Sequence, residues 1–257
     1  MTKNSSFPKQ NKLSGFDIQH FPELYSTQQY LSEQIQLNNL VEGTVVWADY
    51  QTNGYGKESN RWLSEQGANL TFSFLLRPTF LLAENSFSLT QSVALGISDF
   101  LLPWLPEVKV KWPNDIWINH RKICGFITDS QLIGKCFQTA VCGIGLNINQ
   151  QQFCGEAIQG TSLALQTGQT YDLEDCLHGL LRALKVRYEQ LKNGELETIN
   201  RDYHERLFLK NIPHRYCYRN TPITATIIKV DSFGWLVLED ENKRVFSCDL
   251  GEIKLLP

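Results

Sequence analysis

The segment that decides the fold is VKVKWPNDIWINHRKICGFITDSQLIGKCFQTAVCGIGLNIN, residues 108–149. Apolar and polar residues alternate along it, and turn-forming residues stand at Asn119-His120 and near Gly134. A period of two is typical of strands with one buried face, and turns this short join antiparallel neighbours. The segment therefore predicts an antiparallel meander.

Helices and further strands flank this meander. Apolar residues at helical spacing predict helices over residues 26–39, 86–102, 173–191 and 195–207. β-branched and aromatic residues predict strands over 44–50 and 69–78, and a short edge strand over 16–21. This mixture of strands and helices is typical of an α+β fold.

The pattern changes after Ile212. Three short apolar runs, TATIIKV, GWLVLED and RVFSCDL, follow one another at close spacing with turns between them. Such spacing is typical of a small all-β module. We therefore expect a polar leader at residues 1–15, a main domain at 16–210 and a β module at 211–257.

Composition narrows the class of protein. The chain has 257 residues, of which 42% are hydrophobic, and a net charge of −3, and its basic residues form no dominant block. We therefore expect no DNA partner, and no helix-turn-helix pattern precedes the main domain. The seven cysteines show no zinc-type spacing and fit a reducing, cytoplasmic compartment. No signal peptide or run of eighteen apolar residues is seen, so we expect no membrane span.

The loop inside WADYQTNGYGKESNRW, residues 47–62, combines glycine with cationic side chains. Gly54 and Gly56 allow close backbone approach, and Lys57 and Arg61 can neutralise an anion. The combination suits a phosphate cradle. A simple hairpin connection is the commoner outcome for a glycine-containing loop on its own.

Two charged residues of the meander are candidates for chemistry. Asp115 follows Pro113 between strongly apolar strands, and burying an unpaired carboxylate is costly, so we expect it to be partnered or functional, with a turn cap as the alternative. Lys122 opens the next strand, where it either reaches an acidic ligand or extends its amine to solvent. For a single lysine the second outcome is commoner.

The strand CGIGLNIN places Gly143, Gly145 and Asn147 on one face. Glycines inside a strand weaken it unless something lies close against the backbone. A flat ring ligand would account for them, and so would a bulge or tight packing of the protein itself.

Six motifs, taken in order, resemble those of the biotin-protein ligases: YSTQQYL, ADYQTNGYG, GANLTFSFLLRP, KWPNDIWI, RKICGF and GIGLNIN. The resemblance implies a mixed sheet with helices, related to the class II aminoacyl-tRNA synthetase core, and a C-terminal β-barrel of the Src-homology-3 type. It also implies a reaction. Biotin and Mg-ATP would give biotinyl-5'-AMP, and the biotinyl group would pass to a lysine of a biotin carboxyl carrier protein.

The resemblance also implies roles for single residues. Ser26 and Thr27 would bond the ureido ring of biotin beside Gln51. The other biotin-binding positions would be Gly54, Trp62, Lys122, Gly125, Gly143 and Gly145. The adenylate would be held by Gly54, Tyr55, Gly56, Lys57, Arg61, Trp62, Lys111, Asn114 and Asn147. Lys122, Asp115 and Lys57 would be catalytic, and Mg²⁺ would arrive with ATP because no side-chain cluster for a metal is visible.

The glycine-rich loop departs from the family pattern. The family commonly has G-R-G-R-x-G, whereas this chain has GYGKESN, with Tyr55 and Lys57 at the two arginine positions and Ser59 at the third glycine. A non-catalytic biotin-binding protein is therefore one alternative. A lipoate-type ligase is another, since such enzymes share the core. The resemblance also allows a homodimer formed through the edge of the central sheet.

Overall fold

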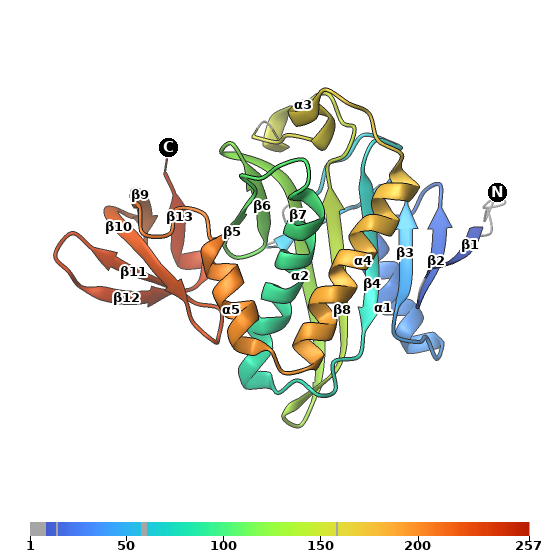
Figure 1. Ribbon diagram of the computed structural model, residues 1–257, viewed down its shortest axis with the longest axis horizontal. Helices are drawn as coiled ribbons and strands as arrows, with labels where there is room; N and C mark the ends of the chain where they lie inside the picture. Colours follow the sequence, from blue (N-terminus) through green and yellow to red (C-terminus); the bar gives the residue numbers. More distant parts are fainter. Residues whose placement is uncertain (1–8, 14, 58–60, 158, 257) are drawn as a thin grey trace.

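The computed structural model describes residues 9–13, 15–57, 61–157 and 159–256. A large sheet carries helices on both faces, and a second, smaller sheet lies at the end opposite the N-terminal strands (Figure 1). No helix in the described part of the chain has the length and apolar character needed to cross a membrane.

The large sheet has eight strands in the order β1-β2-β3-β4-β8-β7-β6-β5. Parallel pairing occurs between β2 and β3, and the other neighbours are antiparallel, so the predicted meander is confirmed. The strands are β1 Lys9–Leu13, β2 Phe16–Phe21, β3 Thr44–Ala48, β4 Leu70–Leu76, β5 Lys109–Lys111, β6 Asp115–Ile118, β7 Arg121–Ile133 and β8 Cys136–Leu146.

The N-terminal edge differs from the sequence prediction. Residues 9–13, expected within a polar leader, form β1, which pairs with β2 in antiparallel register. The prediction of residues 16–21 as an edge strand was therefore wrong, because β2 is paired on both sides. KQNKL has no apolar alternation, and its pairing depends on backbone hydrogen bonds that such a pattern does not reveal.

Five α-helices are described: α1 Thr27–Leu37, α2 Ser86–Leu101, α3 Leu163–Thr167, α4 Leu173–Lys192 and α5 Leu196–Glu205. Short 3-10 turns occupy Ala83–Asn85, Gly155–Ala157 and Leu250–Glu252. The longest helix, α4, begins where the Asp172 side chain accepts the Asp175 N–H at 2.9 Å. It ends before Gly194, whose φ of +79° suits a glycine.

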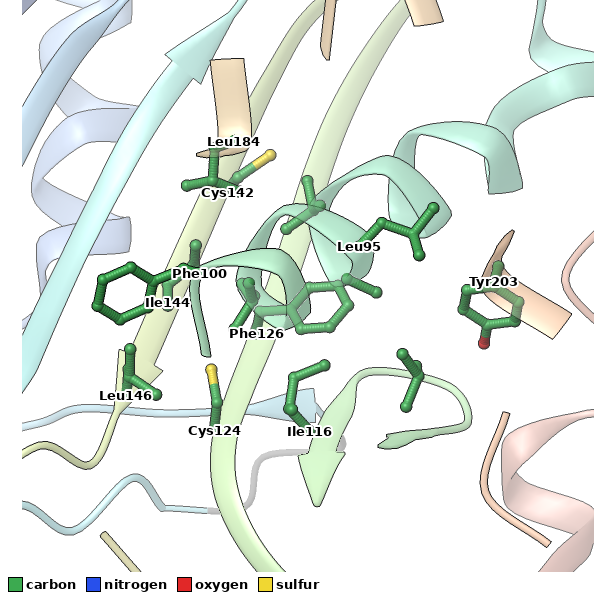
Figure 2. Close-up of a cluster of buried hydrophobic side chains, with 14 of the residues drawn as sticks. Leu95, Phe100, Ile116, Cys124, Phe126, Cys142, Ile144, Leu146, Leu184 and Tyr203 are labelled. Atoms are coloured by element: carbon green, nitrogen blue, oxygen red, sulfur yellow. The ribbon is translucent and has the colours of Figure 1, made fainter. Parts of the chain in front are cut away.

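The two faces of the large sheet are covered unequally. Helices α2, α4 and α5 pack on one face, over residues such as Phe126, Cys142, Ile144 and Leu146 (Figure 2). On the other face, α1 forms only a small cluster with Phe21, Leu31, Val46, Leu75 and Val141. The part of this second face beyond Val141 is therefore open to form a site.

The C-terminal sheet confirms the predicted β module. Its strands are β9 Pro213–Tyr218, β10 Thr221–Val230, β11 Leu236–Asp240, β12 Val245–Cys248 and β13 Ile253–Leu255, in the order β12-β11-β10-β9-β13. Within the described residues, β12 and β13 end the ladder, so closure into a barrel stays a prediction. The Trp112 indole donates to the Gly234 carbonyl at 2.8 Å and ties this sheet to the main body.

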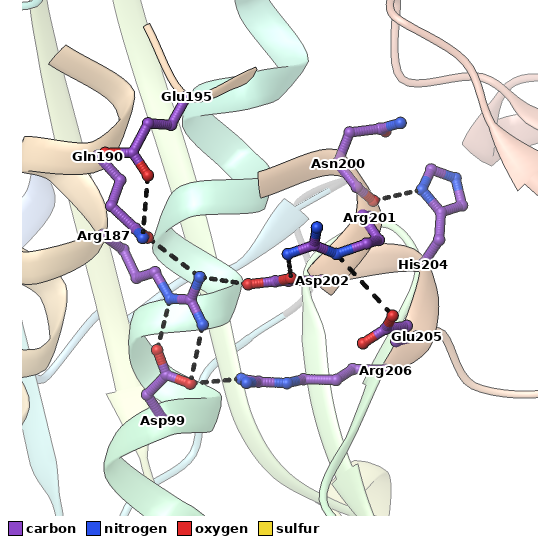
Figure 3. A network of polar contacts seen from close by, with 10 residues as sticks. All are labelled: Asp99, Arg187, Gln190, Glu195, Asn200, Arg201, Asp202, His204, Glu205 and Arg206. Carbon is purple, nitrogen blue, oxygen red and sulfur yellow. Dashed lines mark hydrogen bonds and ion pairs between the residues drawn. The ribbon is translucent and has the colours of Figure 1, made fainter. Parts of the chain in front are cut away.

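A charge network joins the three core-side helices (Figure 3). Arg187 on α4 binds Asp99 of α2 through two nitrogens and Asp202 of α5 at 2.7 Å. Arg206 shares Asp99 at 2.6 Å. Only 9% of the Arg187 side chain is exposed, so its charge depends on these carboxylates.

Asp99→Ala should lower the free energy of unfolding by about 2–4 kcal/mol, because it leaves two guanidinium groups facing each other without their shared carboxylate. Arg201→Ala is the control, since that exposed arginine also binds Asp202, at 2.9 Å. We expect Arg201→Ala to lower the free energy of unfolding by less than about 1 kcal/mol. Urea unfolding measures both, and equal losses would contradict the assignment.

His204 joins α5 to the C-terminal sheet in its neutral form. Its Nε2 accepts the Val230 N–H at 2.9 Å, so Nδ1 carries the proton and donates to the Asn200 carbonyl at 2.7 Å. Burial lowers the pKa of His204, and Lys210 and Lys229 act in the same direction. A proton on Nε2 would break the bond to Val230.

Stability should therefore fall as pH drops below the unfolded-state pKa of histidine, about 6.5, because the unfolded chain then binds the proton more readily. His204→Gln retains an acceptor near Val230 without titrating. Its free energy of unfolding should change less than that of the wild type between pH 7.5 and 5.5, as measured by urea unfolding. Identical pH profiles would rule out this role for His204.

Candidate active site

A cavity of about 210 Å³ lies on the face of the large sheet that α1 leaves open. Its floor is formed by β4, β7 and β8, at Ser73, Gly125, Ile127, Gly143 and Gly145. Alternation along each strand turns these residues away from the helical core, where their neighbours in sequence are buried.

Neutral polar side chains line one end of this cavity. The Thr27 backbone N–H and hydroxyl donate to Gln51 Oε1 at 2.7 and 3.1 Å. The Thr27 oxygen lies 2.9 Å from Ser73 Oγ and is therefore the acceptor of that bond. Ser26 is the N-cap of α1 and lines the same end. The predicted trio Ser26, Thr27 and Gln51 is thus brought together.

The glycines of β7 and β8 have protein side chains directly over them. A Cβ on Gly143 would lie 2.6 Å from Gln28 Oε1, and one on Gly145 would lie 2.3 Å from the Trp62 ring. A Cβ on Gly125 would approach Lys122 at 3.0 Å. Of the alternatives that the sequence allowed, these glycines therefore permit tight packing of the protein's own side chains. Those side chains in turn line the cavity.

Charged side chains line the other end. Lys122 Nζ lies 2.7 Å from Asp115 Oδ1, with 35% and 19% of the two side chains exposed. Lys111 Nζ lies 4.2 Å from the Trp117 ring centre, and burial lowers the pKa of Lys111 more than Asp115 raises it. Arg61 and Lys57 also line the cavity, which makes this end strongly cationic.

A β-bulge directs Lys122 into the cavity. Asp115 pairs with Gly125 and Ile116 with Cys124, but Trp117 pairs with Lys122, so one extra residue lies in β7. Ile123 and Cys124 are consequently both buried in the helical core. Strict alternation would have placed Lys122 on the core face, whereas the bulge places it beside Asp115.

The described residues of the glycine-containing loop contribute to this end of the cavity. Tyr55 and Arg61 form an isolated antiparallel bridge, and the Trp62 N–H donates to the Gly54 carbonyl at 3.0 Å. Tyr55, Gly56 and Lys57 line the cavity, but Gly54 does not and instead holds the base of the loop. The replacement at Ser59 lies outside the described residues.

A second cavity of about 240 Å³ adjoins the first. The two share Arg61, Trp62, Lys111, Asp115 and Lys122. Asn147 lines the second cavity together with Phe153, Ala157, Gln159 and Gly160. Its amide nitrogen donates to the Thr161 carbonyl at 3.0 Å, and its buried Oδ1 has no partner among the described residues. The acceptor Oδ1 is therefore available to a ligand.

A wider cleft of about 630 Å³ separates the site from the C-terminal sheet. It is lined by Asn114, Asp129 and Lys57 from the main body and by Trp235 and Asp249 from the C-terminal module. Leu250 reaches the first cavity itself. The C-terminal module therefore packs against the site. Asn114 also binds the Phe126 carbonyl at 2.7 Å and so fixes the turn.

Comparison with known proteins identifies the family. Residues 21–147 match the Biotin/lipoate A/B protein ligase family. The bifunctional ligase/repressor BirA of Salmonella typhimurium is 30% identical over 90% of this chain and 72% of its own length, and that of Bacillus subtilis is 29% identical over the same shares. The chain belongs to the biotin-protein ligases.

A solved biotin protein ligase from Aquifex aeolicus, in complex with biotin and ATP, has the same fold. It superposes with a TM-score of 0.77 at 25% identity and covers 93% of this chain and 98% of its own. The fold class expected from the motifs is thereby confirmed, with a mixed sheet, helices and a C-terminal β module.

Sequence reasoning missed several lining residues of this ligase, namely Gln28, Ser73, Ile127 and Leu250. Gln28 follows the serine-threonine pair directly, and the period of two on β4 and β7 could have indicated Ser73 and Ile127. Leu250 had no sequence signal. Within the described residues, no group of three or more histidine, cysteine or acidic side chains could hold a metal ion.

Gly145→Ala should displace Trp62, because the added methyl would overlap the indole ring. We expect more tryptophan fluorescence to become accessible to acrylamide, and we expect that gain to disappear in a Trp62→Phe background. Gly179→Ala is the matched control, since its Cβ would meet only Phe100, at 3.0 Å. Unchanged quenching in Gly145→Ala would show that the ring does not depend on this glycine.

Proposed function

We propose that the protein is an ATP-dependent biotin-protein ligase that forms biotinyl-5'-AMP and transfers the biotinyl group to a lysine of a biotin carboxyl carrier protein. The observation that carries the proposal is the polarity of the first cavity. Neutral hydrogen-bonding groups line the end near Gly143, and the Lys122–Asp115 pair lies at the end near Gly145. Biotin has the same arrangement, with a neutral urea at one end and a carboxylate at the other.

The dimensions support this orientation. Gly143 and Gly145 are two residues apart on β8, which corresponds to about 7 Å. The ureido ring would lie by Ser26, Thr27 and Gln51, and the valerate chain would pass beside Trp62 to reach Lys122. The second cavity, with Asn147, would then receive the adenine.

In the first step, a biotin carboxylate oxygen attacks the α-phosphorus of ATP. A C–O–P mixed anhydride forms, and the bond to the pyrophosphate oxygen breaks. Lys122 lines both cavities and can hold two mutually repelling anions together while charge builds on phosphorus. Lys111, Lys57 and Arg61 contribute further positive charge around the phosphates.

In the second step, the carrier lysine amine attacks the acyl carbon, an amide forms, and AMP leaves with the electron pair of the C–O bond. Asp115 is the carboxylate that lines both cavities, and we assign it as acceptor of the amine proton. The loop at residues 54–62 would exclude water from the labile anhydride.

We also propose that Mg²⁺ enters as Mg-ATP. This ion usually keeps most of its ligands as phosphate oxygens and water, so a site in which Asp115 is the single lining carboxylate among the described residues is compatible with it. When bound, it would neutralise phosphate charge.

The proposal also includes a cellular location and an oligomeric state. The seven cysteines are unpaired, which supports a cytoplasmic location. Beyond Gly125, β7 pairs with β8 on one side only among the described residues, and this edge would suit a homodimer.

Two alternatives predict different results. A lipoate-type ligase has no need of a neutral hydrogen-bonding end, because a dithiolane accepts and donates little. A non-catalytic biotin-binding protein would bind biotin without cleaving ATP. Pyrophosphate release with and without biotin, followed by mass analysis of an added carrier domain, separates both from the proposal.

Lys122→Ala should lower the rate of biotin-dependent pyrophosphate release by about 100-fold or more, because the negative charge that builds around the α-phosphorus loses the positive charge that stabilises it. Asp115→Ala should reduce carrier biotinylation more than pyrophosphate release. Single-turnover assays separate the two steps. Lys109→Ala, on the same edge of the sheet but outside both cavities, is the control. Unchanged rates in both site variants would refute the roles.

A further inference from the structure

The side chain of Gln28 is held in one orientation at the neutral end of the first cavity. It is 3% exposed, and its Nε2 donates to Asp129 Oδ2 at 2.8 Å and to the Val141 carbonyl at 2.9 Å. Both protons of the amide are therefore used. Its Oε1 lies over Gly143, is buried, and has no partner among the described residues.

The side-chain amide of Gln51 has the opposite arrangement, with its oxygen occupied and not its nitrogen. Its Oε1 accepts two hydrogen bonds from Thr27, so its nitrogen remains to donate. The same cavity is thus lined by one glutamine that offers an acceptor and one that offers a donor. A buried acceptor without a partner costs free energy, which a ligand donor would recover.

We propose that Gln28 is a specificity-determining residue whose Oε1 accepts one ring N–H of a cyclic urea, and that Asp129 is a positioning residue that keeps the amide in this orientation. The inference rests on the proposed function and extends it. A cyclic urea carries two N–H donors beside its carbonyl, so Gln51 can donate to the carbonyl while Gln28 accepts from one flank. A ring without N–H donors would leave Gln28 unpaired.

The first test is the dissociation constant for biotin, measured by titration calorimetry. Gln28→Met keeps the length of the side chain but removes the acceptor, and we expect biotin to bind about ten- to a hundredfold more weakly. The dissociation constant for ATP should stay within about twofold. Equal biotin binding by wild type and Gln28→Met would overturn the inference and leave the proposed function intact.

Asp129 is tested by a matched pair of variants. Asp129→Asn retains an oxygen that can accept from Gln28 and should bind biotin within about threefold of wild type. Asp129→Ala frees the amide to rotate and should weaken biotin by about tenfold or more. If Asp129→Asn lost as much affinity for biotin as Asp129→Ala, Asp129 would not have the proposed positioning role.

A second test changes the ligand and compares the wild type with Gln28→Met. Two biotin analogues, each methylated at one ureido nitrogen, remove one N–H at a time. The wild type should discriminate against at least one of them, and Gln28→Met should have lost most of that discrimination. Wild type that bound both analogues as tightly as biotin would overturn the inference. Wild type that bound no biotin at all would instead refute the proposed function.

Discussion

The contact between Lys122 and Asp115 depends on one extra residue in β7. Without the bulge at Ile123, the lysine would point into the apolar core, where an unpaired amine could not be accommodated. With it, the amine lies 2.7 Å from the carboxylate at the junction of two cavities. Each member compensates the other's charge in the absence of ligand, so both can be held at a partly buried site.

The unequal covering of the large sheet explains why the site lies where it does. Three helices bury one face completely enough to fix the strands, and the charge network around Arg187 holds those helices together. The other face needs only α1, because small residues there allow side chains to lie flat on the backbone. The rigid face supports the site, and the sparsely covered face provides room for it.

Much of the fold could be predicted from the periodicity of apolar residues and from the turn-forming residues. The alternation in residues 108–149 predicted the antiparallel meander, and the apolar spacing over residues 173–191 predicted α4. The site was predictable only as a set of motifs. β1 has no apolar pattern, the bulge at Ile123 breaks the period, and the orientation of Gln28 depends on Asp129, 101 positions away in the chain. Long-range contacts of this kind leave no local signal.

The tyrosine and lysine that replace the family's arginines in the glycine-containing loop affect where the positive charge of the site lies. Burial raises the pKa of Tyr55, and Asp129 acts in the same direction, so the phenol stays neutral and cannot supply the charge of the arginine common at this position. Lys57 and Arg61 are exposed on the loop, whereas Lys111 and Lys122 project from the sheet. Charge carried by the sheet needs no loop closure to be in place. In the proposed mechanism, the neutral tyrosine therefore leaves more of the electrostatic stabilisation to Lys111 and Lys122 on the sheet, and Lys57 and Arg61 are the cationic side chains that the described part of the loop adds.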